Sequence, residues 1–215
     1  MAANASKAKE IISALGKEYQ NARISLNFSN PMQLLVSVML SAQCTDKMVN
    51  IVTKGLFGKY KTSADFAGAD LKALEQEIRP TGFYRNKARN VINAAKMIIN
   101  DFNGKVPDTM ESLLELPGVA RKTANIVLSN AYGKLEGIAV DTHMRRVNYR
   151  LGLTKKTDPD KIEQDLMKII PKRLWSSYTH LIIRHGRAVC KASVPHCSRC
   201  VLNGICPKEG VTKKV

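Results

Sequence analysis

The segment Leu116–Ala124 places one lysine, Lys122, directly after a Pro-Gly pair between two expected helices. Pro117 lacks a backbone N–H and Gly118 readily adopts left-handed backbone, so the pair ends the first helix in a tight reversal. Such a hairpin directs the unpaired N–H groups of residues 118–120 outward at the positive end of the second helix, where a phosphate oxygen can bind. Lys122 then stands about one helical turn from that phosphate. We favour this arrangement over the alternative, a solvated lysine between two core helices.

The elements that flank this turn can be read from capping and breaking residues. Asp108, followed three residues later by Glu111, predicts the start of the first helix. The helical pattern resumes at Thr123–Ala131, and Gly133 predicts its end. The segment therefore predicts two helices joined by a very short hairpin.

Four of the five cysteines form a second group with potential chemistry, in the spacing C-x6-C-x2-C-x5-C. They are Cys190, Cys197, Cys200 and Cys206. Such a cluster in an intracellular protein favours a metal over disulfides. Zinc ribbons normally use two C-x2-C pairs, and this chain has one, whereas four thiolates in one short stretch also suit a [4Fe–4S] cluster. The spacing indicates a metal centre and leaves both metals open, with iron–sulfur modestly favoured. Cys44 stands apart and is predicted to be a small packed residue.

The charge balance indicates the kind of partner. The chain has 34 Lys and Arg residues against 18 Asp and Glu, a formal net charge of +16, and the basic residues are scattered along its length. A folded, positively charged surface of this kind favours nucleic acid. The rival partner, an acidic membrane, is disfavoured because no strongly basic amphipathic helix lacks core positions. Lys191, His196 and Arg199 lie in the cysteine loops, where they could place cations against phosphates.

The hydropathy pattern predicts an all-α intracellular protein. Hydrophobic residues make up 44% of the 215 residues, no apolar run is long enough for a membrane span, and the first ten residues are polar. No useful β-alternation appears, and helical spacing recurs along the chain. We expect helices over 7–19, 32–40, 49–60, 70–78, 87–102, 158–170 and 173–184, the last burying Trp175, Tyr178 and Ile182.

Three further sites combine an expected element with residues suited to chemistry. The apolar stretch Met32–Leu40 predicts a buried central helix, which runs into the polar corner Ser41–Asp46. Phe83 and Tyr84 follow a Pro-Thr-Gly break; both rings could be core, or a ring could wedge between bases. Asp141 follows three apolar residues in the position of a helix cap, which is the role of most Asp residues in such a setting.

These segments together resemble endonuclease III of the helix-hairpin-helix glycosylase superfamily. The resemblance covers residues 25–206 and rests on Leu40–Asp46, Leu116–Asn125, Val140–His143 and the cysteine spacing, in that order. It implies two helical domains that flank a DNA-binding cleft. One, residues 24–135, is a six-helix barrel with the hairpin, and the other joins residues 1–23 to 136–215 with a C-terminal cluster loop. It also implies a [4Fe–4S] cofactor held by the four clustered cysteines.

The implied activity is a bifunctional DNA glycosylase and AP lyase of base excision repair. It removes oxidised pyrimidines from duplex DNA and cleaves the 3′ side of the abasic site by β-elimination. By resemblance, Lys122 is the nucleophile, Asp141 is its catalytic partner, and Gln43 fills the gap left by the extruded base. The expected DNA-binding residues are Gln43, Phe83, Gly118, Val119, Ala120, Arg121 and Lys191. The implied partner is double-stranded DNA with a damaged base or abasic site, met by a monomer in the cytoplasm or nucleoid.

The chain departs from the family pattern at three positions. Phe83 stands where the family often has a leucine wedge, Ala120 replaces a hairpin glycine, and Cys44 replaces an alanine. An adenine glycosylase on this scaffold would have a glutamate near Ser37 and lack the lysine, so it fits poorly. Two alternatives stay open: a mismatch-specific monofunctional glycosylase, and a non-enzymatic DNA-binding protein with a structural cluster.

Overall fold

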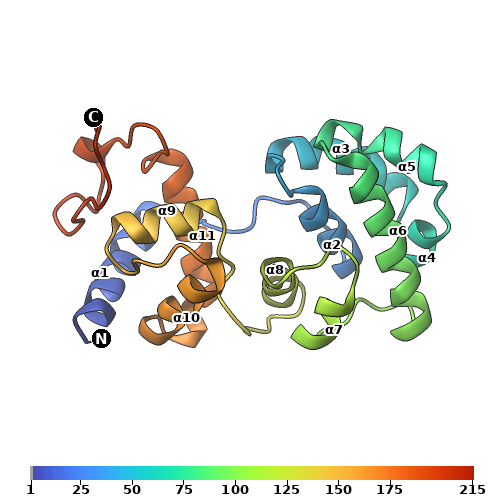
Figure 1. The fold of residues 1–215 in the computed structure, drawn as a ribbon, viewed down its shortest axis with the longest axis horizontal. Helices are drawn as coiled ribbons and strands as arrows, with labels where there is room; N and C mark the ends of the chain where they lie inside the picture. Colours follow the sequence, from blue (N-terminus) through green and yellow to red (C-terminus); the bar gives the residue numbers. More distant parts are fainter. Residues whose placement is uncertain (1) are drawn as a thin grey trace. The chain divides into compact units, whose positions relative to one another are not determined.

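The computed structural model describes residues 2–215, and it is all-helical, as the sequence predicts. No strand occurs among these residues, and none of their helices is long and apolar enough to cross a membrane. The chain divides into two compact units (Figure 1). One unit is Ser25–Glu136, here called the hairpin unit, and the other joins Met1–Ile24 to Gly137–Val215, here called the cysteine unit.

The hairpin unit is built around one buried helix. Its elements are α2 (Pro31–Leu40), α3 (Asp46–Lys59), α4 (Ser63–Ala67), α5 (Leu71–Glu77), η1 (Arg79–Thr81), α6 (Tyr84–Asp101), α7 (Met110–Glu115) and α8 (Arg121–Ala131). Every residue of α2 after Pro31 is buried, because α3, α6 and α8 all pack against this apolar helix. The Asn30 side chain accepts a hydrogen bond from the Gln33 N–H, and Pro31 begins the helix. The predicted central helix is therefore confirmed.

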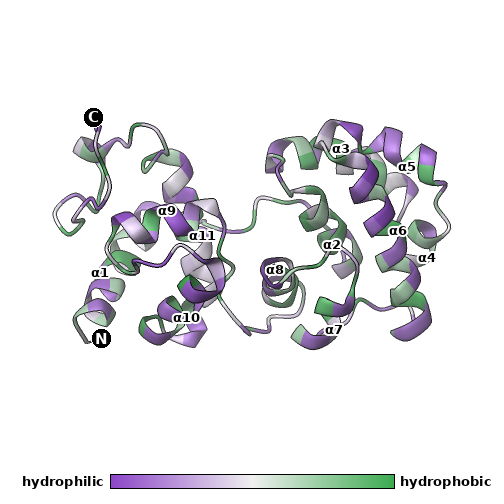
Figure 2. Cartoon of the chain, in the orientation of Figure 1, coloured by the Kyte–Doolittle hydropathy of each residue, from purple (hydrophilic) through white to green (hydrophobic). Residues whose placement is uncertain are grey.

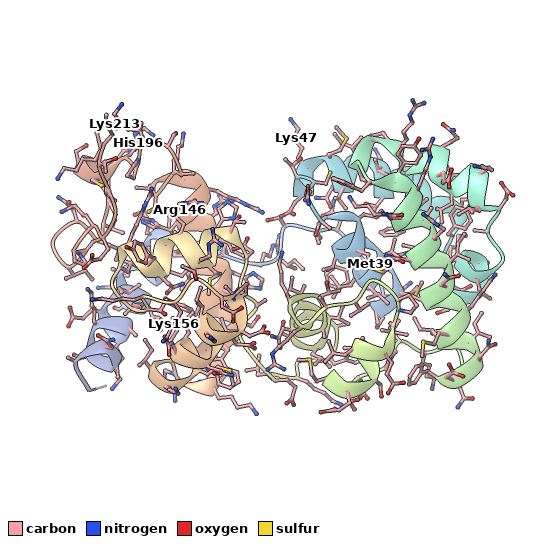
Figure 3. The ribbon with its side chains drawn as sticks, in the orientation of Figure 1. Met39, Lys47, Arg146, Lys156, His196 and Lys213 are labelled. Carbon is pink, nitrogen blue, oxygen red and sulfur yellow. The ribbon has the colours of Figure 1, made fainter. Side chains whose placement is uncertain are left out.

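Helix α6 shows how amphipathic spacing builds this unit. Ala88, Val91, Ala95 and Ile98 are buried on one side, and Figure 2 shows hydrophobic and hydrophilic residues on different sides of the helix. Helices α4 and α5 pack against α6. Apolar and charged side chains elsewhere in the unit divide in the same way. Met39 of α2 is buried in the core of the unit, whereas Lys47 of α3 is exposed to solvent (Figure 3).

The cysteine unit packs four helices beneath a C-terminal segment with little regular structure. Its elements are α1 (Ala2–Glu18), α9 (Thr142–Arg150), α10 (Pro159–Ile169), η2 (Lys172–Leu174), α11 (Trp175–Ala188) and η3 (Cys197–Arg199). Helix α11 packs against α9 and α1, and it buries Trp175, Tyr178 and Ile182 as predicted. Gly186 permits the approach of α9, since a Cβ there would lie 3.2 Å from the His143 side chain.

The start of α7, predicted at Asp108, lies one residue later in the structure. The side chain that caps α7 belongs to Thr109, whose Oγ1 accepts the Ser112 N–H at 3.3 Å. Asp108 instead pairs with Lys134, with 2.5 Å between Oδ2 and Nζ. Both residue types are good caps, so local preference does not decide between these two neighbouring positions. Helix α1, predicted to begin at Lys7, begins at Ala2.

Candidate DNA-binding hairpin and cysteine cavity

The predicted hairpin joins α7 to α8 through residues 116–120. Leu116 and Val119 are buried and anchor the turn, and the Val119 N–H donates to the Leu116 carbonyl at 3.1 Å. Gly118 has a φ of +79°, which explains the need for glycine. Ala120, at φ −99°, takes extended backbone that any residue adopts. Because its side chain is buried, Val119 could contact DNA only through its backbone.

The start of α8 is open to a ligand. No side chain caps this helix, whereas Asn30, Thr45 and Asp141 cap α2, α3 and α9. The first backbone N–H groups of a helix lack intrahelical partners and carry the positive end of its dipole. Lys122 is exposed in this first turn. An uncapped N-terminus beside an exposed amine can bind an anion and place a nucleophile next to it.

The missing side chain of Gly118 also leaves room for a residue of α6. A Cβ on Gly118 would lie 2.8 Å from the Asn90 amide nitrogen, so α6 packs directly on the turn. The sequence offered no signal for this contact, because Asn90 has no motif and lies 28 residues upstream. Asn90 is therefore a second determinant of the hairpin geometry.

We expect Gly118→Ala to destabilise the protein more than Gly133→Ala. Both glycines have positive φ, so either alanine costs about 1–2 kcal/mol of backbone strain. Nothing lies within 4 Å of a Cβ at Gly133, whereas at Gly118 the Asn90 side chain must move, which adds about 1 kcal/mol or more. Urea unfolding measures the difference. Equal losses of stability for the two single variants would contradict the packing argument.

Two other predicted DNA-contacting residues lie in exposed turns of the hairpin unit. Gln43 is exposed at a φ of +52° in the corner after α2. Phe83 is 63% exposed at a φ of +49° and immediately precedes α6, which also lacks a side-chain cap. The alternative of a core position for Phe83 is wrong. Tyr84, half-buried, lies against the guanidinium groups of Arg79 and Arg85.

Asp141 caps α9 in the cysteine unit. Its Oδ1 accepts the Met144 N–H at 2.8 Å, and its Oδ2 lies 2.9 Å from His143 Nδ1. These bonds fix the carboxylate in one orientation. The capping role that the sequence predicts is thus confirmed, and it does not exclude a second role for the same carboxylate.

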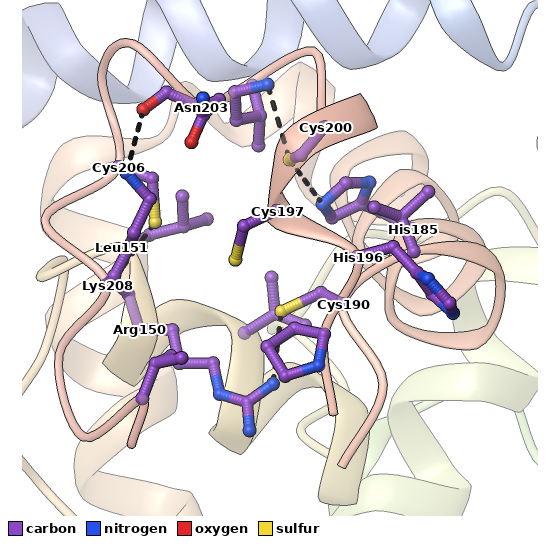
Figure 4. Close-up of a pocket in the computed structure, with 15 residues that line it drawn as sticks. Arg150, Leu151, His185, Cys190, His196, Cys197, Cys200, Asn203, Cys206 and Lys208 are labelled. Carbon is purple, nitrogen blue, oxygen red and sulfur yellow. Dashed lines mark hydrogen bonds between the residues drawn. The ribbon is translucent and has the colours of Figure 1, made fainter. Parts of the chain in front are cut away.

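The four clustered cysteines line one cavity of the cysteine unit (Figure 4). Apolar side chains such as Val147, Leu151 and Leu202 share the lining. Within residues 2–215, no three Cys, His, Asp or Glu side chains are close enough to hold a single metal ion. Tetrahedral zinc needs four sulfurs at about 2.3 Å from one point, whereas a multi-atom cluster separates its sulfur ligands further. Four thiolates around one cavity are a donor set that an iron–sulfur cluster can use.

Hydrogen-bonding groups lie against the sulfurs of Cys190 and Cys200. Arg150 Nη1 lies 3.4 Å from Cys190 Sγ, the Leu202 N–H donates to Cys200 Sγ at 3.4 Å, and His185 Nε2 lies 3.5 Å from the same sulfur. Burial lowers the pKa of His185 to about 4, so its ring is neutral near pH 7. Burial also raises the pKa of the Cys200 and Cys206 thiols, which favours the thiol until a cation or cluster binds.

Arg150 organises the loops that carry the cysteines. Its guanidinium donates to the carbonyls of Lys191 and Ala192 at 2.6 and 2.9 Å, and its own carbonyl accepts the Glu209 N–H. Neither Arg150 nor His185 was predicted from the sequence, because each lies at least 15 residues from the cysteine it contacts. Lys191 is exposed in these loops.

Comparison with known proteins shows extensive similarity. The model of the HhH-GPD superfamily of base excision DNA repair proteins matches residues 36–172. Endonuclease III of Synechocystis sp. is 51% identical over 207 residues, which cover 96% of this chain and 94% of the relative. A solved non-covalent endonuclease III–DNA complex superposes with a TM-score of 0.91 at 46% identity, covering 95% of both chains. A trapped endonuclease III–DNA covalent intermediate, the estranged-adenine complex, gives the same score and identity, covering 95% of this chain and 96% of that one.

Proposed function

This chain belongs to the HhH-GPD superfamily of base excision DNA repair proteins, and from that premise we propose that it is a bifunctional DNA glycosylase and AP lyase. Its partner is double-stranded DNA that contains a damaged base or an abasic site. Its substrates are oxidised pyrimidines, which it excises before cleaving the backbone on the 3′ side. The observation that carries the proposal is Lys122, an exposed amine in the first turn of the uncapped helix α8, in a chain 46% identical to one trapped covalently on DNA.

The hairpin anchors the damaged strand. The N–H groups of Gly118 and Ala120 bind one phosphate oxygen at the positive end of α8, whereas the Val119 N–H already donates to the Leu116 carbonyl. Arg121 adds a positive charge beside this site, and Lys191 adds one on the cysteine unit. This contact carries no sequence information, and it holds the sugar near Lys122 whatever the flanking bases.

The damaged base must leave the stack before its C1′ can be attacked, at a cost of a few kcal/mol. Gln43 and Phe83 are exposed side chains in turns of fixed left-handed backbone. We assign them to the space that the extruded nucleotide leaves, where an amide and an aromatic ring can replace lost stacking and hydrogen bonds. Extrusion then presents C1′ to the amine.

Lys122 acts as the nucleophile. The neutral amine bonds to C1′ as the glycosidic C1′–N bond breaks, and the base leaves with the electron pair. Ring opening gives a Schiff base between Nζ and C1′, which makes the C2′ proton acidic. Loss of that proton expels the 3′ phosphate by β-elimination, and hydrolysis releases the lysine.

Asp141 is assigned to the positive charge that develops on the sugar. Its carboxylate is fixed by the cap bond to Met144 and the contact with His143, so it is oriented before substrate binds. A fixed negative charge favours the oxocarbenium-like state more than the neutral ground state. It can also take up a proton during the elimination.

We expect Asp141→Asn to slow base excision by about 10²–10³-fold while preserving the fold, because the amide oxygen can keep the cap to Met144 while the negative charge beside His143 is lost. Asp158→Asn is the matched control: Asp158 caps α10 in the same unit through the Lys161 N–H. Single-turnover excision and thermal unfolding measure both effects. If the two variants lost excision equally, the charge of Asp141 would have no special role.

The four clustered cysteines are proposed to hold a [4Fe–4S] cluster. Such a cluster supplies a rigid centre that links loops of little regular structure, and we assign it that role here. Cys190, Cys197, Cys200 and Cys206 would be its ligands.

Borohydride trapping tests the proposed activity. The protein incubated with a duplex that contains an abasic site and then reduced should form a stable covalent adduct, and duplexes with single defined lesions should rank its substrates. Without an adduct, excision alone would indicate a monofunctional glycosylase. Binding alone, weakening steeply with salt, would indicate a non-enzymatic DNA-binding protein.

A further inference from the structure

Lys87 is a buried lysine outside the proposed chemistry. It lies on α6 and is 6% exposed. Its Nζ donates hydrogen bonds of 2.8 Å to the carbonyls of Leu40 and Thr81. Burial lowers the pKa of this ammonium, and no salt bridge to Lys87 occurs among residues 2–215. Burying a charged group without an opposite charge costs free energy, and here the two carbonyl hydrogen bonds are the contacts that offset this cost.

The two carbonyls belong to the two turns that carry the exposed side chains Gln43 and Phe83. Leu40 is the last residue of α2, three residues before Gln43. Thr81 is the last residue of η1, two residues before Phe83. Both exposed residues have left-handed backbone, which for a residue other than glycine persists only where the surroundings fix it. Lys87 therefore bonds to the base of each turn.

An ammonium group binds two carbonyls at once more strongly than a neutral side chain would. The carbonyl of Leu40 is among those that a helix end leaves without a partner, and the three donors of an ammonium can serve two carbonyls at once. Charge-assisted hydrogen bonds are also stronger than neutral ones, above all away from water. Two segments 41 residues apart are thereby tied through one atom.

We propose that Lys87 is a positioning residue for base extrusion, which holds the turns of Gln43 and Phe83 at a fixed separation. The inference rests on the proposed function. Side chains that enter the base stack must hold their positions against bases that tend to stack again. If the turns that carry them move, the side chains stabilise the extruded nucleotide less. Lys87 acts only through these two side chains, because its burial keeps it from DNA.

The test compares two substrates of one enzyme. Lys87→Met fills similar volume without donors. We expect it to slow excision from a thymine glycol duplex at least tenfold in single turnover. Its β-elimination rate on a single-stranded abasic oligonucleotide, where no base need be extruded, should stay within about twofold of wild type. Ser63→Ala is the matched control. It removes a part-buried hydrogen bond of the same unit, from Ser63 Oγ to the Gly104 carbonyl at 3.0 Å, and should leave both rates unchanged.

A double-mutant cycle gives an independent readout. If Lys87 acts through Phe83, then Phe83→Ala should slow excision in the wild type and have little further effect in Lys87→Met. Lys87→Gln, which keeps an N–H donor on a side chain one atom shorter, replaces Lys87→Met in both experiments if the latter does not fold. Equal losses on both substrates, or additive effects in the cycle, would overturn the proposal. An inactive wild type would instead refute the proposed function itself.

Discussion

Lys122→Gln is expected to abolish the covalent adduct with abasic DNA and to reduce strand cleavage by about 10⁴-fold or more. Glutamine has no nucleophilic amine, so neither attack on C1′ nor the Schiff base can occur. Duplex binding should persist within about threefold, because one positive charge among many is lost and the hairpin N–H groups remain. Trapping gels measure the adduct, and fluorescence anisotropy measures binding.

The control for charge is Lys105→Gln. Lys105 is an exposed lysine of the same unit, and its replacement changes the net charge equally. It should form the adduct at the wild-type rate. Nicking of abasic DNA by Lys122→Gln at the wild-type rate would remove Lys122 from its proposed role.

Cys197→Ser is expected to remove the cluster and to unfold the loops that carry the four clustered cysteines. The wild type purified without oxygen should contain iron and sulfide and show broad visible absorbance, and the variant should lose both. Outside η3 the segment after α11 has no helix, so hydrogen bonds such as those of Arg150 and the cluster hold it in place. Loss of a centre that folds its own ligand loops costs much of their folding energy, on the order of several kcal/mol.

Limited proteolysis and absorbance spectra distinguish local from global unfolding. Cleavage of Cys197→Ser should concentrate after Val189, while the hairpin unit stays resistant. Cys44→Ser is the matched control, since Cys44 is the one cysteine away from the cavity, and it should keep the absorbance. A colourless wild type with stoichiometric zinc would refute the cluster.

Local chemistry explains what could be predicted. The cap of α9 at Asp141 and the buried α2 both follow from residues within a few positions of one another. Asp108 shows the limit of such arguments, because the next residue, Thr109, is an equally good cap and is the one that caps α7. Phe83 shows the same limit, since turn residues do not reveal whether a ring packs inward.

The helices, the Pro-Gly hairpin that presents Lys122 and the grouping of the four cysteines could be predicted from sequence, because capping, backbone freedom and periodicity act over a few residues. Lys87 lies at helical spacing with the apolar residues of α6, which is a local signal of a buried charge. No nearby residue indicates that the carbonyls of Leu40 and Thr81 are its partners. Tertiary structure alone decided that Lys87 joins two turns, that Asn90 packs on Gly118, and that Arg150 and His185 face the cysteines. These contacts join residues far apart in the chain, and only the packing of helices sets such distances.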